Sequence, residues 1–163
     1  MDTHQAILAR RSIRAFTDRP VTRPEIEQLL VLAIAAPNHR LTAPLRFAVL
    51  GPAARHGYGS ILGARKAKKL DDPVAAAALI AKVAEQEAAV PALIAVSVHL
   101  NDNPEIREED YATAMMAVQN LMLGAVAMGL GTHQRSGAVM DDPRTRDLLG
   151  LADTESLVAL EQL

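Results

Sequence analysis

The segment EEDYATAMMAVQNLMLGAVAM, residues 108–128, carries apolar side chains on nearly every face of the helix that its composition favours. Such a helix has to be buried, either in a bilayer or in protein. Thr113, Gln119 and Asn120 interrupt the apolar run, and they leave an unbroken stretch shorter than the roughly 20 residues that a membrane span needs. The segment therefore predicts a long buried helix, packed between a sheet and a second subunit.

Shorter elements surround this helix. Thr22 and Glu25 form a capping box with proline at the first helical position. Apolar residues then recur every three or four positions, as on one face of a helix, until Pro37 ends the pattern. The same kinds of signal predict helices at 2–10, 22–36, 73–87 and 142–149, and strands at 46–50, 92–100 and 155–160. The expected fold class is α/β (α+β), a small central mixed sheet flanked by helices.

Residues 51–72 break this regularity. They contain four glycines and a basic cluster, and they predict a mobile segment with a short helix, suited to a lid or a variable insertion. The cluster consists of Arg65, Lys66, Lys68 and Lys69. A solvated face is the plainest interpretation of these four charges, and a grip on nucleic acid is a weaker alternative.

Composition limits the possible functions. The 163 residues fit one domain, 1–163, and the net charge of −2 argues against a nucleic-acid partner. The absence of cysteine excludes disulfides and a thiolate nucleophile, and scattered histidines leave no metal site. No signal peptide or membrane span is evident, so the expected location is cytoplasmic.

Three clusters of residues could carry chemistry. The first is RRSIR at 10–14, whose guanidinium groups could grip a phosphate or could simply offset a helix dipole. The second is APNHR at 36–40. Its His39 lies on a loop of the kind that often forms a binding site, but it could also be an ordinary surface residue. The third is GLGTHQRSG at 129–137, which could approach a flat ligand closely or could simply end the long helix.

No catalytic side chain stands out from these clusters. The GxG of the third cluster follows a helix instead of a strand, so it is not a dinucleotide fingerprint. There is no GxSxG, no Walker loop and no evident carboxylate pair. The acidic runs at 108–110 and 141–142 are interpreted as negative charges at the N-termini of helices, where they favour the helix dipole.

Taken together and in this order, the clusters resemble the nitroreductase superfamily, particularly its small single-domain members, over roughly residues 2–160. The family pattern RRSxRxF appears at 10–16, APxHxxxxPWRF at 36–47, and GxGxxWRSG at 129–137. The resemblance implies a homodimer with FMN at the subunit interface and the long helix at the dimer core. It also implies an NAD(P)H-dependent oxidoreductase that passes electrons to a small acceptor such as a nitroaromatic or a quinone.

By resemblance, the cofactor-binding residues are Arg10, Arg11, Ser12, Arg14, His39, Gln134, Arg135 and Ser136. The first four would hold the FMN phosphate and the flavin pyrimidine edge, with Arg14 as the positive group that stabilises the reduced anion. His39 would reach the flavin of the partner subunit, and the last three would lie along the isoalloxazine. No catalytic side chain is expected, because the flavin carries the chemistry.

The sequence departs from the family pattern at three places. Gln134 and Leu45 replace tryptophans, and the family's C-terminal arm is not found after Leu163. A family member that has lost catalysis, and that binds flavin or acts as a dimeric interaction protein, is therefore the alternative function. Under the leading hypothesis, the basic residues at 65–69 could instead attract the phosphate of NADPH.

Overall fold

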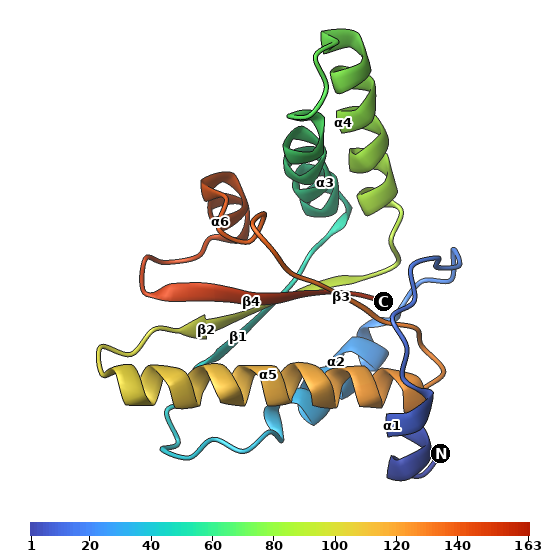
Figure 1. Cartoon of the computed structure of the whole chain (residues 1–163). Coiled ribbons are helices and arrows are strands. Elements are labelled where there is room, and N and C mark those ends of the chain that lie inside the picture. Colours follow the sequence, from blue (N-terminus) through green and yellow to red (C-terminus); the bar gives the residue numbers. More distant parts are fainter.

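Six helices and four strands, described here from a computed structural model of residues 1–163, are arranged around one sheet (Figure 1). In chain order they are α1 (Thr3–Ala9), α2 (Arg23–Ile34), β1 (Leu45–Val49), α3 (Pro52–Ala67), α4 (Pro73–Ala88), β2 (Leu93–His99), α5 (Pro104–Ala127), β3 (His133–Arg135), α6 (Pro143–Leu149) and β4 (Glu155–Gln162). The predicted α/β fold class is confirmed.

The four strands pair in the order β1-β2-β4-β3, and every ladder is antiparallel. The prediction of a mixed sheet is met only by an isolated parallel bridge between Ser12 and Thr132, which extends the β3 edge. Strand β3 was not predicted, because three residues are too few to show an alternating pattern.

Helices cover both faces of the sheet. Helices α1, α2 and α5 lie on one side, and α3, α4 and α6 lie on the other (Figure 1). The first side holds a core in which α2 and α5 pack on Ile94, Val96 and Ala159. The second side holds a core in which Tyr58 and Ile61 of α3 pack on Leu93 and neighbouring strand residues.

The long helix was predicted correctly, but it begins earlier than expected. Asn103 caps it by accepting from the backbone N–H of Glu105, and Pro104 occupies its first turn. Its buried side chains include Val118, Leu121 and Met122. None of the six helices combines the length and the apolar content that crossing a bilayer requires.

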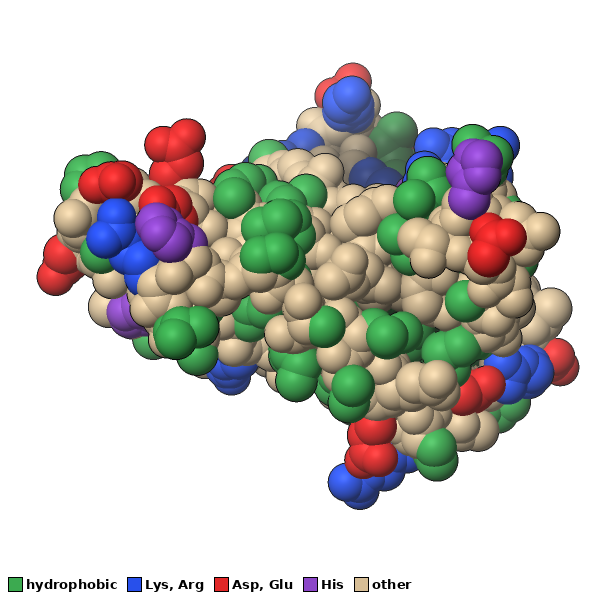
Figure 2. Space-filling model, turned by 90° about the horizontal axis from the view of Figure 1, so that it is seen from below, with side chains coloured by type: hydrophobic (Ala, Val, Ile, Leu, Met, Phe, Trp, Pro, Cys, Tyr) green, Lys and Arg blue, Asp and Glu red, His purple; other side chains and the backbone are tan.

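The side of the molecule formed by α1, α2 and α5 keeps many apolar side chains exposed. They are Ile7 and Leu8 of α1, Val31 and Ile34 of α2, Leu41 of the following loop, and Tyr111 and Met116 of α5. Leu41 is 87% exposed. Figure 2 shows this side, with hydrophobic side chains spread across its middle and most charged ones at its margins. Apolar surface of this extent is typical of a surface that binds another protein.

The prediction of a mobile segment at 51–72 was wrong, since α3 is a continuous helix packed along α4. Its glycines serve close packing. A Cβ on Gly59 would lie 2.7 Å from the Cα of Ala84, and a Cβ on Gly63 would lie 2.8 Å from the Cα of Ile80. The two helix backbones can approach this closely only where α3 has no side chain.

Replacing Gly59 with alanine should destabilise the protein. Backbone atoms surround the new methyl group and cannot move aside, so we expect the free energy of unfolding to fall by about 1–2 kcal/mol, after alanine's better helix propensity offsets part of the overpacking cost. Denaturant unfolding measures the change. Gly51→Ala is the matched control, because nothing lies within 4 Å of its Cβ position; an equal loss in both variants would contradict the packing argument.

One carboxylate of the sheet is fully buried. Glu161 of β4 is fully buried, and neither of its oxygens has a hydrogen-bond partner. Burial raises the pKa of Glu161 to about 8, although the positive charge of Arg10 opposes the shift. The folded chain therefore binds this proton more tightly than the unfolded chain does.

This raised pKa predicts a pH dependence of stability. Between the ordinary pKa of 4.5 and about 8, the folded protein holds more protons than the unfolded one, so the free energy of unfolding should fall as the pH rises through this window. The slope from one group is at most about 1.4 kcal/mol per pH unit. Glu161→Gln should flatten it, as measured by urea unfolding between pH 5.5 and 8, whereas the exposed Glu108→Gln should not. Parallel slopes for Glu161→Gln and the unsubstituted protein would rule the argument out.

Candidate functional site

The first and third sequence clusters meet beside the β3 edge. The N–H of Ile13 donates to the carbonyl of Thr132 at 2.8 Å, next to the bridge between Ser12 and Thr132. Gly131 makes this approach possible, because a Cβ there would lie 3.0 Å from side-chain atoms of Ile13. The structure thus brings residues 10–14 and 132–136 together from opposite ends of the chain.

Residues of the first cluster point in alternate directions, as in extended backbone. The Arg11 guanidinium turns back to α1 and donates to the carbonyls of Leu8 and Arg10, both at 2.7 Å. Arg11 and Ile13 line one cavity of about 450 Å³, whereas Arg14 lines a different one. Arg11 thereby behaves as the helix-end arginine of the alternative interpretation, and its role toward a cofactor stays a prediction.

The third cluster forms β3 and the turn after it. Gln134 pairs with Glu161 in the ladder, Arg135 pairs with Leu160, and Ser136 is exposed beyond the strand. The Arg135 guanidinium makes a 2.9 Å ion pair with Glu87, near the end of α4. Its Nε is buried without a partner. Arg135 is therefore fixed in place while keeping one donor unused.

Glu87 is the centre of a buried polar network that the sequence analysis missed. Its second oxygen accepts from Gln162 at 2.6 Å, and the Gln162 carbonyl lies 3.1 Å from Nδ1 of His133. Burial raises the pKa of the Tyr58 hydroxyl to about 12, and the nearby charges of Arg135 and Glu87 also act on this pKa, in opposite directions. The network joins the α3–α4 hairpin to β3 and β4.

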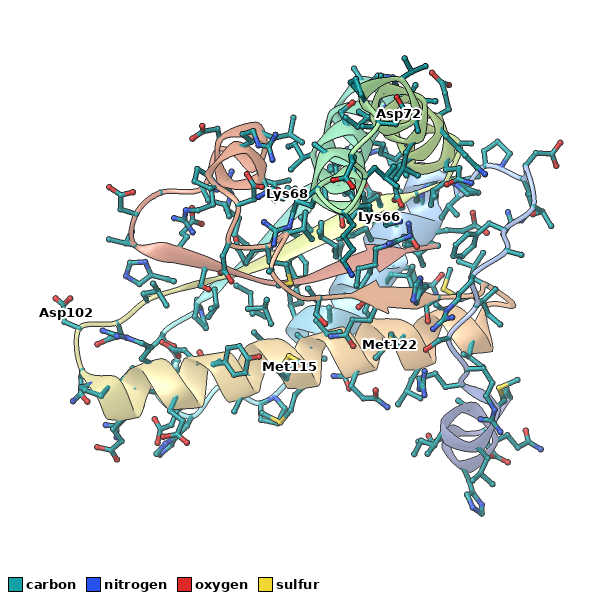
Figure 3. All side chains as sticks on the ribbon, turned by 45° about the horizontal axis from the view of Figure 1, so that its top comes forward. Lys66, Lys68, Asp72, Asp102, Met115 and Met122 are labelled. Atoms are coloured by element: carbon teal, nitrogen blue, oxygen red, sulfur yellow. The ribbon has the colours of Figure 1, made fainter.

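A polar cavity of about 350 Å³ opens beside this network. Its lining consists of Arg14, Phe16, Lys66, Gln86, Glu87, Ala89, Val90, Arg135 and Gln162. Figure 3 shows Lys66 over the sheet, whereas Lys68 lies toward α6. The basic cluster at 65–69 is therefore divided: Lys66 lines the cavity, and Arg65 lies 3.5 Å from Asp142.

The second sequence cluster lies elsewhere. Nδ1 of His39 is 2.9 Å from Glu109, and Arg40 donates to the other oxygen of Glu109 at 2.8 Å. Hydrogen bonds from Arg40 and then from His39 lower the pKa of Glu109. The acidic run at 108–110 thus holds the histidine loop, since Asp110 also accepts from Thr42. Its interpretation as helix N-terminal charge was incomplete, because α5 begins at Pro104.

Helix α5 separates the two parts of the candidate site. Glu109 lies near its start and Gly129 directly after its end, which is about 30 Å of helix at 1.5 Å per residue. Within one chain, His39 is therefore not brought to Arg10, Ser12, Arg14 and Arg135. Leu45, at a family tryptophan position, packs against core residues at the start of β1.

The arrangement around β3 suits an anionic ligand. Arg10 and Arg14 take part in no ion pair, and the backbone between Thr132 and Gly137 forms an edge that a flat molecule can approach. Lys66, Glu87 and Gln162 belong to this site but not to the predicted set. One feature of the sequence could have identified Glu87: it is a charged residue on the apolar face of its helix.

Comparison with known proteins identifies the family of this chain. The model of the Nitroreductase family matches residues 7–160. YfhC of Bacillus subtilis, which its name assigns provisionally to the NAD(P)H nitroreductases, is 31% identical over 96% of this chain and 80% of its own length.

Solved structures give the same result. A nitroreductase-like family protein from Bacillus cereus superposes with a TM-score of 0.85 at 26% identity, covering 99% of this chain and 84% of that one. A provisionally named nitroreductase from Desulfovibrio desulfuricans, solved in complex with FMN, has a TM-score of 0.72 at 24% identity, covering 98% of this chain and 83% of that one. With matching motifs, fold and family model over nearly its whole length, this chain belongs to the Nitroreductase family.

Proposed function

We propose that this protein is an FMN-dependent oxidoreductase that transfers electrons from NAD(P)H to a small acceptor, such as a nitroaromatic or a quinone. The observation that carries the proposal is the junction of residues 10–14 with residues 132–136, in a chain that belongs to the Nitroreductase family. The B. subtilis relative and the FMN-containing neighbour support the choice of donor and cofactor.

The residues at this junction fit FMN. A phosphate group brings about −1.5 to −2 charges at neutral pH. The guanidinium group of Arg14 forms no ion pair that would compete with it, and that of Arg10 has only Glu161 nearby, whose pKa is raised to about 8. Arg135 keeps a buried Nε without an acceptor. Gln134 and Ser136 offer amide and hydroxyl groups beside it. The donor set is thus cationic and polar, as suits a phosphate and a ring system that becomes anionic when it is reduced.

FMN, when bound, supplies the electron-transfer chemistry. The chain's own residues would hold and surround it: Arg10 and Ser12 would bind its phosphate, and Arg14 would place positive charge at its pyrimidine edge. Arg135 would lie along the ring, in an orientation set by its ion pair with Glu87. No side chain here is needed as nucleophile or general base.

The working unit is a homodimer. His39 lies at the far end of α5 from Arg14, so a second copy is required to complete a site that contains both. The exposed apolar side chains of α1, α2, α5 and Leu41 form a surface suited to that copy (Figure 2). Burying such side chains contributes roughly 25 cal/mol per Å² of apolar area.

The first test is an absorbance spectrum of the protein after incubation with excess FMN and desalting, followed by anaerobic addition of NADPH. We expect retained flavin that bleaches. Arg14→Met should weaken FMN binding about tenfold or more, since it removes a charged contact. Arg23→Met is the control, because Arg23 is exposed and pairs only with Glu27 on α2.

Each result of this experiment selects one function. Flavin that is retained but not bleached by NADPH or NADH would leave a flavin-binding protein without this activity, which the replaced tryptophans at positions 45 and 134 favour. Absence of retained flavin at micromolar protein would leave a dimeric interaction protein and would overturn the proposal.

The dimer can be tested separately. Ile34→Asp places a charge on the exposed apolar surface, so it should shift the protein from twice the mass of the 17.4 kDa chain toward the single chain. It should also reduce FMN retention, because His39 is withdrawn from the partner's site. Light scattering after gel filtration measures the mass. Val74→Asp, at a position that is also exposed but lies on α4, should change neither property, and an unchanged mass for Ile34→Asp would argue against this surface.

A further inference from the structure

Glu161 of β4 is a buried carboxylate to which the proposed function gives no role. Its side chain is fully buried, and neither of its oxygens has a hydrogen-bond partner. An ionised carboxylate in such surroundings is costly, whereas an apolar side chain would fill the same position without that cost. The ionisation of Glu161 is therefore sensitive to any charge that lies near it.

The side chain of Glu161 points to the side of the sheet on which α1, α2 and α5 lie. Residues two apart in an extended chain share a face, and Ala159 and Leu163 both belong to the core of that side. Ile94, the partner of Glu161 on β2, belongs to the same core. Arg10 caps the end of α1, which lies on this side of the sheet (Figure 1). Glu161 and Arg10 therefore face the same layer of the molecule.

Arg10 is the charged group that acts on Glu161 in this layer. Burial raises the pKa of Glu161, and Arg10 is the one charge that opposes the shift. The two side chains are not hydrogen-bonded, since both oxygens of Glu161 lack a partner. Of the neighbouring arginines, Arg11 turns back to α1, and Arg14 lines the cavity beside the α3–α4 hairpin. Arg10 thus has an acidic neighbour that attracts it strongly only when that neighbour is ionised.

The other groups around Glu161 do not replace Arg10 as its partner. Helix α5 carries no Asp, Glu, Lys, Arg or His between 111 and 127, and the charged residues of α2 form ion pairs at its surface. His4 of α1 is exposed, and Gln134, the partner of Glu161 on β3, is uncharged. A free α-carboxylate on Leu163 would stay ionised at every pH above about 5. Arg10 is therefore the cation to which an ionised Glu161 turns.

We propose that Glu161 and the phosphate of FMN compete for Arg10, so that the protein binds FMN less tightly when Glu161 is ionised. The inference rests on the proposed function, in which Arg10 binds the phosphate. While Glu161 is neutral, the guanidinium is available to the phosphate. Once Glu161 is ionised, its charge attracts the guanidinium and repels the phosphate. Binding of FMN therefore favours a proton on Glu161 and is accompanied by proton uptake wherever the free protein has lost it.

The direction of the pH effect follows from this competition. In the flavin-free protein, Glu161 passes from mostly protonated to mostly ionised as the pH rises through about 8. Because the protonated form binds FMN better, the Kd for FMN should rise about fivefold between pH 7.5 and pH 9, within the limit of tenfold per pH unit that one proton sets. The phosphate loses its second proton near pH 6, so its own charge is constant in this range.

The test is a titration of flavin fluorescence at pH 7.5 and pH 9, with FMN and with riboflavin, which lacks the phosphate. The fivefold rise in Kd should occur for FMN and be absent for riboflavin. Glu161→Gln should bind FMN equally at both pH values, whereas the exposed Glu108→Gln should keep the fivefold rise. Arg10→Met should bind FMN more weakly than the unsubstituted protein at pH 7.5 and show no further loss at pH 9. Calorimetry at pH 8.5 in two buffers of different ionisation enthalpy measures the proton uptake.

Three results would overturn the inference: the same rise in Kd for riboflavin, a rise that survives in Glu161→Gln, or a rise that survives in Arg10→Met. A protein that binds no FMN at pH 7.5 contradicts the proposed function instead. The competition is then decided in the flavin-free protein, by a carboxyl NMR titration with and without inorganic phosphate. Phosphate should raise the titration midpoint of Glu161, and Arg10→Met should abolish this response; an unchanged midpoint would overturn the inference.

Discussion

The burial of α5 is the constraint on which the rest of the structure depends. Its apolar side chains point in nearly all directions, so the sheet, α2 and α1 each cover only part of it. Tyr111 and Met116 stay exposed, next to the exposed apolar residues of α2. The same helix holds the loop of His39 about 30 Å from β3. The exposed face of α5 and the separation of the two parts of the site therefore both follow from the length and apolar character of this helix. A second copy of the chain would cover the exposed face and would bring its own His39 to the site beside β3.

The ion pair between Arg135 and Glu87 makes the α3–α4 hairpin part of the site. A buried carboxylate is costly unless it is paired, and Glu87 is satisfied from both sides by Arg135 and Gln162. Glycines in α3 let the two hairpin helices pack closely, which fixes the end of α4 over the sheet. Substitutions in the hairpin can therefore alter the position of Arg135 without touching the cofactor.

Elements with strong local signals were predictable from the sequence. Helices α2, α4 and α6 each begin with a capping residue followed by proline, and the strands β1, β2 and β4 are apolar runs between breakers. Asn103-Pro104 is the same kind of signal, and recognising it would have placed the start of α5 correctly. Only a short helix was predicted where α3 lies, because glycine lowers helix propensity, whereas here the missing side chain of glycine allows close packing with α4. That reason exists only once both helices are in place.

For the site, the sequence predicted the clusters that join at β3, because each is a continuous motif, but it named Lys66 only as part of the basic cluster at 65–69 and did not name Glu87. Their roles come from distant segments: Lys66 meets Arg14 only across the cavity, and Glu87 meets Arg135 only through the fold. Glu87 was nevertheless open to inference. It lies four residues after Val83, on the stripe that α4 turns inward. A carboxylate at such a position needs a buried cationic or hydrogen-bonding partner. The sequence could therefore show that Glu87 needs a partner, but only the fold, in which the strand of Arg135 passes the end of α4, shows which cation it is.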